Sequence, residues 1–163
     1  MNKIRFRGGT RTLGIVAAVG CLVFGGCVYE VPITPKPTRK IDEKFLGDWT
    51  AKDATDNKTI KMKVVRLDDF NYIVSFKGDL YRAYHSDVAG MPFVSVQILD
   101  SAKPEYAYSA WKLSEDGKLI GRPVSDKVVP DVTKDSASVQ KLLERNLQNP
   151  VLFEEEVRFT KDK

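Results

Sequence analysis

The feature that most constrains the fold is an alternation of apolar and polar residues with a period of two. In "KTIKMKVV", lysines separate the apolar side chains of Ile60, Met62 and Val64, as expected of a β-strand with one face in water. The same period runs through "NYIVSF" and "FVSVQIL", and turn residues such as Lys77-Gly78-Asp79 separate the segments. Six such segments joined by short turns predict an antiparallel up-and-down sheet.

One later segment, "DSASVQKLLERNLQNP", has the period of a helix instead. Ser136 or Asp135 is its candidate N-cap, and Asn149-Pro150 is its stop signal. Val157 and Phe159 then return to the strand alternation. The apolar helical face consists of Val139, Leu142, Leu143 and Leu147.

These signals together predict the fold class. A flat sheet of this length would leave two long edges unpaired, and closure into a barrel removes them. We therefore expect a mainly β chain: a single antiparallel up-and-down barrel over residues 45–163, with one C-terminal α-helix before the last strand. The length suits one domain with one core.

The first 26 residues have the pattern of an export signal. Residues 1–11 are basic, residues 13–24 are uncharged and mostly apolar, and Gly25 and Gly26 are small. The apolar run is shorter than the roughly 20 residues that a membrane-spanning helix needs. The chain's two cysteines, Cys21 and Cys27, lie at the end of this segment, and a disulfide between them is an alternative to a processing role.

Charge excludes one class of partner. The net charge of +4 equals the four basic residues of the leader, Lys3, Arg5, Arg7 and Arg11, so that the remaining chain is neutral. A basic pI would suggest nucleic-acid binding. Because this excess positive charge is removed together with the leader, we predict no nucleic-acid partner.

Residues 27–44 separate the leader from the barrel. Pro32, Pro35 and Pro37 favour an extended backbone over a helix. We interpret this segment as a tether that holds the folded part away from a membrane. An early strand over Val28 to Ile33 is the alternative, which proline makes less favourable.

"VFGGC" resembles the bacterial lipobox, in which small residues precede a cysteine that is acylated and becomes the first residue of the mature protein. Cys27 is the matching residue; Phe24 departs from the usual Leu or Val, and Cys21 is a rival acceptor. The resemblance implies a lipid anchor that holds the protein to a membrane. Val28 after the anchor favours, by the same analogy, the outer membrane and a position facing the periplasm.

"FLGDW" resembles the Gly-x-Trp start of lipocalins and related calycins. In that family the tryptophan plugs the closed base of the barrel under an arginine of the last strand. The resemblance implies that Trp49 is the plug and Arg158 its cation–π partner. The alternative is an ordinary core tryptophan after a turn glycine.

The order of motifs along the mature chain is similar to that of a group of small, functionally uncharacterised bacterial lipoproteins. This resemblance implies a location and a barrel-like fold, and it carries no activity or catalytic residue. The matching residues are Cys27, Leu46, Gly47, Trp49, Ser136, Ser138, Leu142, Leu143, Pro150, Leu152, Phe153, Val157 and Phe159.

Residues suited to catalysis are scarce. His85 is the only histidine, and its neighbours Ser86 and Asp87 diverge from it along a strand, which disfavours a catalytic triad. The acidic run of Glu154 to Glu156 lacks the spacing of a calcium loop. We predict no catalytic residue, metal site or cofactor.

Aromatic residues are the best candidates for a binding site. They crowd the middle strands and either fill the barrel or line a cavity for a small apolar or amphipathic ligand. Two functions follow: a ligand-binding module, or an envelope protein that acts through its surface. The proposed pocket residues are Tyr81, Tyr84, Tyr106, Tyr108 and Trp111.

Overall fold

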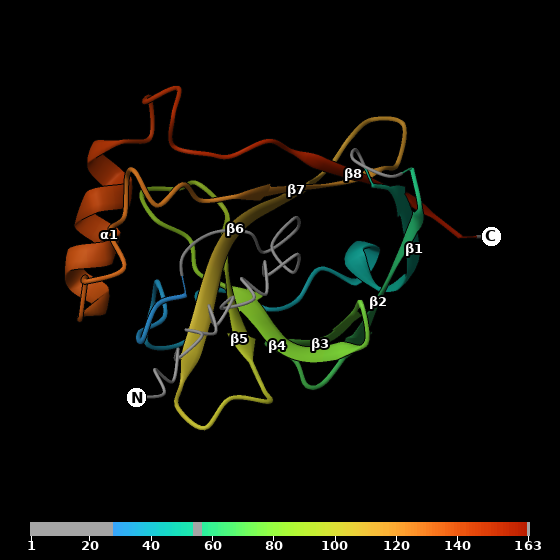
Figure 1. Cartoon of the computed structure of the whole chain (residues 1–163), viewed down its shortest axis with the longest axis horizontal. Coiled ribbons are helices and arrows are strands. Elements are labelled where there is room, and N and C mark those ends of the chain that lie inside the picture. The colour runs from blue at the N-terminus through green and yellow to red at the C-terminus, as the bar shows by residue number, and fades with distance from the viewer. Residues whose placement is uncertain (1–27, 54–56, 163) are drawn as a thin grey trace, which may run out of the picture.

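The computed structural model describes residues 28–53 and 57–162. Within them, eight antiparallel strands pair in chain order and close into a barrel, and one α-helix precedes the last strand (Figure 1). The predicted fold class is confirmed. The elements are η1 (Glu43–Phe45), β1 (Gly47–Lys52), β2 (Thr59–Arg66), β3 (Asn71–Phe76), β4 (Asp79–His85), β5 (Phe93–Ile98), β6 (Glu105–Leu113), β7 (Leu119–Pro123), α1 (Ser136–Arg145) and β8 (Val157–Lys161).

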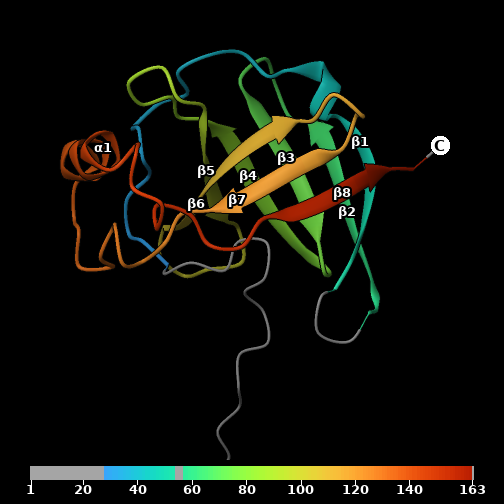
Figure 2. The ribbon, with the colours of Figure 1, turned by 90° about the horizontal axis from the view of Figure 1, so that it is seen from above.

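The barrel has two different ends. We call the end formed by the β1–β2, β3–β4 and β5–β6 hairpins the mouth end, which lies at the bottom of Figure 2. The opposite end, where η1 lies, is called the closed end. At that end η1 packs Phe45, whose side chain is 5% exposed, into the barrel core.

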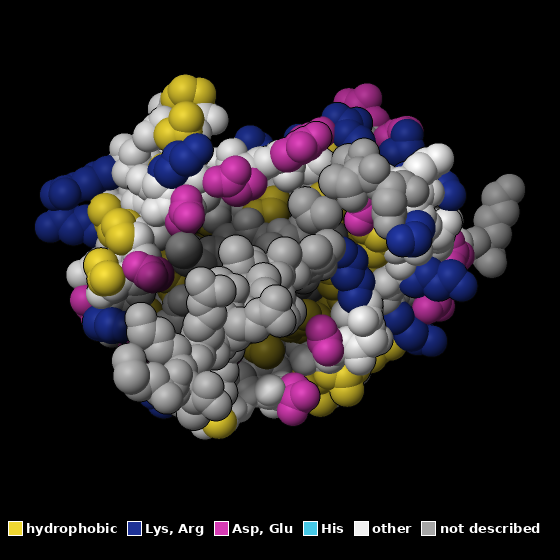
Figure 3. All heavy atoms as spheres, viewed as in Figure 1, with side chains coloured by type: hydrophobic (Ala, Val, Ile, Leu, Met, Phe, Trp, Pro, Cys, Tyr) yellow, Lys and Arg dark blue, Asp and Glu magenta, His cyan; other side chains and the backbone are white. Residues whose placement is uncertain are grey.

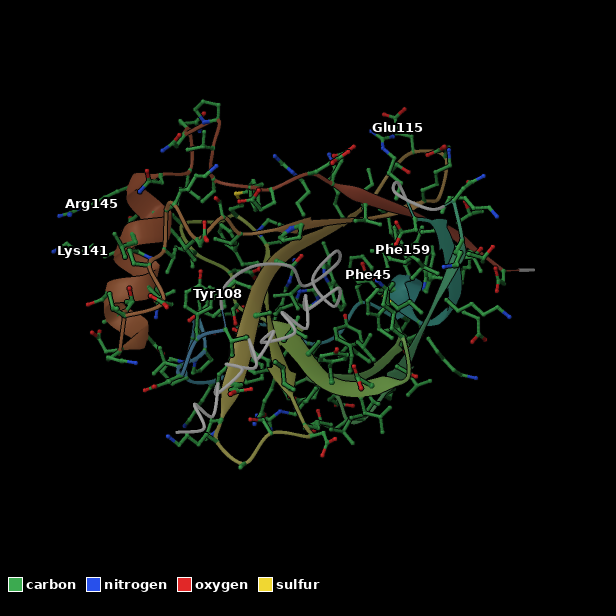
Figure 4. The ribbon with its side chains drawn as sticks, in the orientation of Figure 1. Phe45, Tyr108, Glu115, Lys141, Arg145 and Phe159 are labelled. Carbon is green, nitrogen blue, oxygen red and sulfur yellow. The ribbon has the colours of Figure 1, made fainter. Side chains whose placement is uncertain are left out.

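Strand alternation builds the barrel core as predicted. In β2 the inward side chains Ile60, Met62 and Val64 are buried, whereas the lysines between them are exposed. Figure 4 shows Phe45 and Phe159 within the barrel. The largest core side chains are Phe45, Trp49, Tyr72, Phe76, Trp111 and Phe159.

A second apolar cluster covers the outer face of β5 and β6. The helix contributes Val139 and Leu143, both fully buried, and Figure 1 shows α1 beside the barrel rather than over either end. Asp135 is the N-cap, because its carboxylate accepts from the Ser138 amide at 2.8 Å. The helix thus covers the outside of the sheet and does not close a barrel end.

The proline-containing segment differs from its prediction as a tether. Residues 29–41, which we call the strap, lie against the barrel, and Figure 2 shows them rising between α1 and the barrel before crossing towards η1. Tyr29 and Ile33 are buried at 1% and 0% exposure in the outer cluster. The tether prediction is wrong for this part of the chain, because Tyr29 before the prolines and Ile33 between them are buried against the barrel.

The buried hydroxyl groups under the strap form hydrogen bonds with one another and with the strap backbone. The Thr34 hydroxyl donates to Ser86 Oγ at 2.7 Å, and Ser86 Oγ lies 2.8 Å from Ser95 Oγ. The Ile33 amide donates to Ser95 Oγ at 3.0 Å. Such a connected network avoids the cost of burying unpaired hydroxyls, and it fixes the strap in one position.

No helix in the described part of the chain has both the length and the apolar character required to cross a bilayer.

Candidate functional site

The five aromatic residues predicted to line one pocket do not come together. Tyr81 and Trp111 pack with the core inside the barrel, whereas Tyr106 and Tyr108 belong to the outer cluster. Strand alternation explains the separation, since residues an odd number apart on β6 face opposite sides. The pocket prediction for this set is therefore wrong.

Two of these tyrosines hold the strap in place. Tyr84 donates its hydroxyl to the Thr34 carbonyl at 2.9 Å, and Tyr108 donates to the Val31 carbonyl at 2.5 Å. Burial raises the pKa of Tyr84 to about 12 and that of Tyr108 further. Both hydroxyls therefore stay protonated as donors, and their role is structural.

Trp49 is the third residue of β1 and lies at the closed end, near η1. It is 1% exposed, and its indole Nε1 donates to the Phe45 carbonyl at 2.9 Å. The cation over its ring is Lys161, whose Nζ lies 5.2 Å from the ring centroid. Gly47 is required beside it, because a Cβ there would lie 2.7 Å from Lys161 Cε and the backbone has φ +135°.

Arg158 does not partner Trp49, which corrects the prediction. Its Nε donates to the Glu156 carboxylate at 2.8 Å, and its side chain is 59% exposed. In β8 the inward side is occupied by Phe159, so the neighbouring Arg158 faces outward, whereas Lys161 shares the inward side and pairs with Trp49 in register. Arg158 and Lys161 are three residues apart, so they face opposite sides of the strand, and only Lys161 reaches the indole.

The predicted lipidation residue, Cys27, and its rival Cys21 lie outside the described residues.

His85 is sealed inside the closed end. It is 1% exposed, its Nε2 lies 2.9 Å from the Tyr72 hydroxyl, and its Nδ1 lies 3.3 Å from an Arg39 nitrogen. Because a guanidinium only donates, Nδ1 is the acceptor and Nε2 carries the proton. Burial, followed by the charge of Arg39, lowers the pKa of His85 to about 4. The imidazole is therefore neutral at physiological pH and links the strap to the barrel.

The most promising site lies where β1 and β8 separate. These strands pair only at Trp49–Lys161 and Thr50–Thr160, and β8 then follows β7 towards the mouth end. The space between them is a pocket of about 820 Å³. Its apolar lining consists of Ala51, Ile60, Pro123 and Val157.

The rim of this pocket is acidic. Glu154, Glu155 and Glu156 line it together with Arg158, and Figure 3 shows a row of acidic side chains along the segment that leads into β8. Arg158 pairs with Glu156. Glu154 and Glu155 have no ion pair among the described residues. An apolar floor below two free carboxylates suits a molecule with an apolar body and a basic or hydroxylated head.

Sequence reasoning missed this pocket. None of the five predicted aromatic residues lines it, nor do they line the pockets of about 570 Å³ beside β2 or 610 Å³ beside Phe70. In the sequence, its floor residues have the pattern of ordinary strand positions. The acidic run Glu154 to Glu156 was the one sequence feature that could have indicated the pocket. Within the described ranges, no group of three or more His, Cys, Asp or Glu residues is arranged to hold a metal ion.

Comparison with protein-family models, curated proteins and solved structures gives no match for this chain. The architecture itself, a closed antiparallel barrel of eight strands, is consistent with a lipocalin-like barrel.

Proposed function

We propose that this protein is an exported bacterial lipoprotein of the cell envelope that binds a small amphipathic molecule in the pocket between β1 and β8. The observation that carries the binding function is the pocket of about 820 Å³ with its apolar floor and acidic rim. Ligand pockets typically have volumes of about 300–1,000 Å³. A pocket of this size and lining favours ligand binding over a purely structural envelope role.

The anchoring part of the proposal rests on the leader and on Cys27. A thiolate is the nucleophile that accepts an acyl-bearing group, and more than one chain is needed for stable attachment to a bilayer. The lipobox resemblance supplies both the acceptor and the modification. Val28 after the acceptor favours the outer membrane facing the periplasm, and the closed barrel agrees with the calycin-like part of the resemblance.

Cys27→Ser is expected to abolish lipid attachment. Cells given labelled palmitate should transfer no label to this variant, and the protein should leave the membrane fraction, because the proposed acceptor thiol has been removed. Cys21→Ser is the matched control and should be labelled like the wild type. Loss of label in the control would make Cys21 the acceptor, and label in both variants would contradict lipidation at either single site.

Val157→Trp is expected to weaken ligand binding by at least about tenfold, which corresponds to roughly 1.4 kcal/mol. Val157 is half-buried and lines the pocket floor, so a larger side chain there fills the pocket space. The measurement is titration with the neutral apolar fluorophore N-phenylnaphthylamine, followed by native mass spectrometry of any co-purifying molecule.

Val151→Trp is the matched control for this substitution. Val151 is 49% exposed and does not line the pocket, so its variant should bind the fluorophore as the wild type does. Equal binding by all three proteins would place the fluorophore elsewhere and would overturn the proposed site.

A further inference from the structure

We infer that the mouth end of the barrel lies directly on the lipid surface, so that the ligand of the β1–β8 pocket comes from the membrane itself. This inference rests on the proposed lipid anchor at Cys27. Its structural basis is the strap, which leaves almost no free chain between the anchor and the barrel.

The strap is fixed to the barrel from its first residue, Tyr29, onwards. The Tyr29 amide donates to the Tyr106 carbonyl and the Tyr106 amide donates to the Tyr29 carbonyl, both at 2.8 Å. The Tyr29 ring stacks on Tyr108 with 4.0 Å between centroids, and its hydroxyl donates to the Val129 carbonyl at 2.7 Å. Tyr29 therefore cannot serve as part of a flexible spacer.

Its position along the barrel is equally defined. Tyr106 is the second residue of β6, which begins at the mouth end directly after the β5–β6 hairpin. Only Val28 separates Tyr29 from Cys27. Two residues of extended chain span at most about 7 Å, whereas the nine residues of β6 span roughly 30 Å. The anchor must therefore lie close to the mouth half of the barrel.

The surface around this end suits contact with lipid. Leu80 and Leu99 are 51% and 45% exposed, and their backbones are joined by a hydrogen bond of 3.3 Å from the Leu99 amide to the Leu80 carbonyl. Lys77 and Lys103 belong to the same two hairpins. Leucines flanked by lysines match the interface between acyl chains and headgroups, since a lysine extends its charge into the headgroup layer.

Electrostatic attraction to anionic lipid is not expected to drive contact between this surface and the membrane. Asp79 and Asp100 lie on the same hairpins as the two lysines, so the local charge is balanced. Contact should therefore depend on the anchor and on the leucines rather than on anionic lipid. The closed end also exposes apolar side chains, Leu67 and Phe70 at 51% and 42%, so the inferred orientation depends on the proposed anchor, which lies at the other end.

The pocket lies at the same end. Ile60 and Val157, in its floor, stand at the mouth-end starts of β2 and β8. A single-chain amphiphile leaving the leaflet that holds the anchor would reach this opening without crossing water. The class of ligand that fits is consequently a membrane-derived amphiphile with a basic or hydroxylated head.

The test uses the complete lipoprotein in vesicles of phosphatidylethanolamine and phosphatidylglycerol that carry brominated acyl chains. Once Cys27 is acylated and the leader removed, the protein has no other thiol, so Leu99→Cys and Glu115→Cys each give one labelling site for a fluorophore. Glu115 is the control because it lies at the tip of the β6–β7 turn at the closed end (Figure 4). We expect quenching by the brominated chains to be several-fold stronger at position 99 than at position 115.

A second variant tests the short link. Inserting about ten Gly and Ser residues between Cys27 and Val28 adds a flexible spacer, and should reduce quenching at position 99 to the level at position 115. Equal quenching at both positions in the protein without the insert, stronger quenching at position 115, or full quenching at position 99 after insertion would each overturn the inference. Mass spectrometry of the amino terminus separates the two proposals: an acylated protein without preferential quenching overturns only the orientation, whereas an amino terminus without acyl mass removes the anchor as well.

Discussion

Tyr29→Ala is expected to lower the free energy of unfolding by about 3–5 kcal/mol, the usual cost of deleting a fully buried aromatic side chain. Tyr29 is 1% exposed, stacks on Tyr108 and bonds to the Val129 carbonyl. Its loss would leave a cavity and also an unpaired carbonyl under the strap. Denaturant unfolding of the detergent-solubilised protein, followed by circular dichroism, measures the change.

Two neighbouring variants serve as controls for the strap. Tyr29→Phe keeps the stacked ring and removes one hydrogen bond, so it should cost only about 1 kcal/mol. Val28→Ala changes a side chain that is 46% exposed, and exposed positions typically change stability by less than about 0.5 kcal/mol. If Tyr29→Ala were as mild as Val28→Ala, the strap would not be an integral part of the folded domain.

Acidification from about pH 6.5 to about pH 4 is expected to lower the free energy of unfolding by roughly 3 kcal/mol through His85 alone. Its folded-state pKa is lowered from 6.5 to about 4, so the unfolded chain binds the proton first as the pH falls. The stabilising contribution is complete above the unfolded pKa and is lost as the pH falls through the folded one. Unfolding measured at several pH values across this window checks the slope.

His85→Gln should remove most of this pH dependence of the free energy of unfolding, because glutamine does not titrate but can still donate to the Tyr72 hydroxyl. The pH range of this loss also distinguishes the contribution of His85 from that of carboxylates whose pKa is lowered. Asp116, for example, has its pKa lowered to about 2 by its hydrogen bonds with Lys118 and Ser114, so its contribution is lost at lower pH. An unchanged slope in His85→Gln would show that other groups control acid stability.

Local periodicity was sufficient to predict the barrel and the helix. Alternation in segments such as 58–65 and 71–76 reports directly which side chains face the core, and the structure buries Ile60, Val64 and Phe76 accordingly. The helix was equally predictable: its N-cap was expected at Ser136 or Asp135 and is Asp135, and Val139 and Leu143 lie on the buried face. These features depend on neighbours within a few residues, which a single sequence contains.

The strap and the pocket depend on partners far away in the chain. The prolines in residues 32–37 correctly indicated a non-helical backbone there, but nothing nearby in the sequence shows that Tyr29 contacts Tyr106 and Val129. The failed aromatic pocket has a different cause, because the odd spacing of Tyr108 and Trp111 already places them on opposite faces of one strand. The pocket forms where β1 and β8 stop pairing and diverge. No local sequence pattern marks the residues at which two distant strands separate.

The bond between the Tyr29 hydroxyl and the Val129 carbonyl joins residues 100 positions apart in the chain. A contact of this separation closes late, because most of the intervening chain must be ordered before the ends can meet. During synthesis the amino-terminal segment consequently stays undocked until residue 129 has emerged and β6 has found its place. The proposed acylation at Cys27 and removal of the leader would both need an accessible backbone, and this delay in docking would leave time for both steps while the rest of the protein is made.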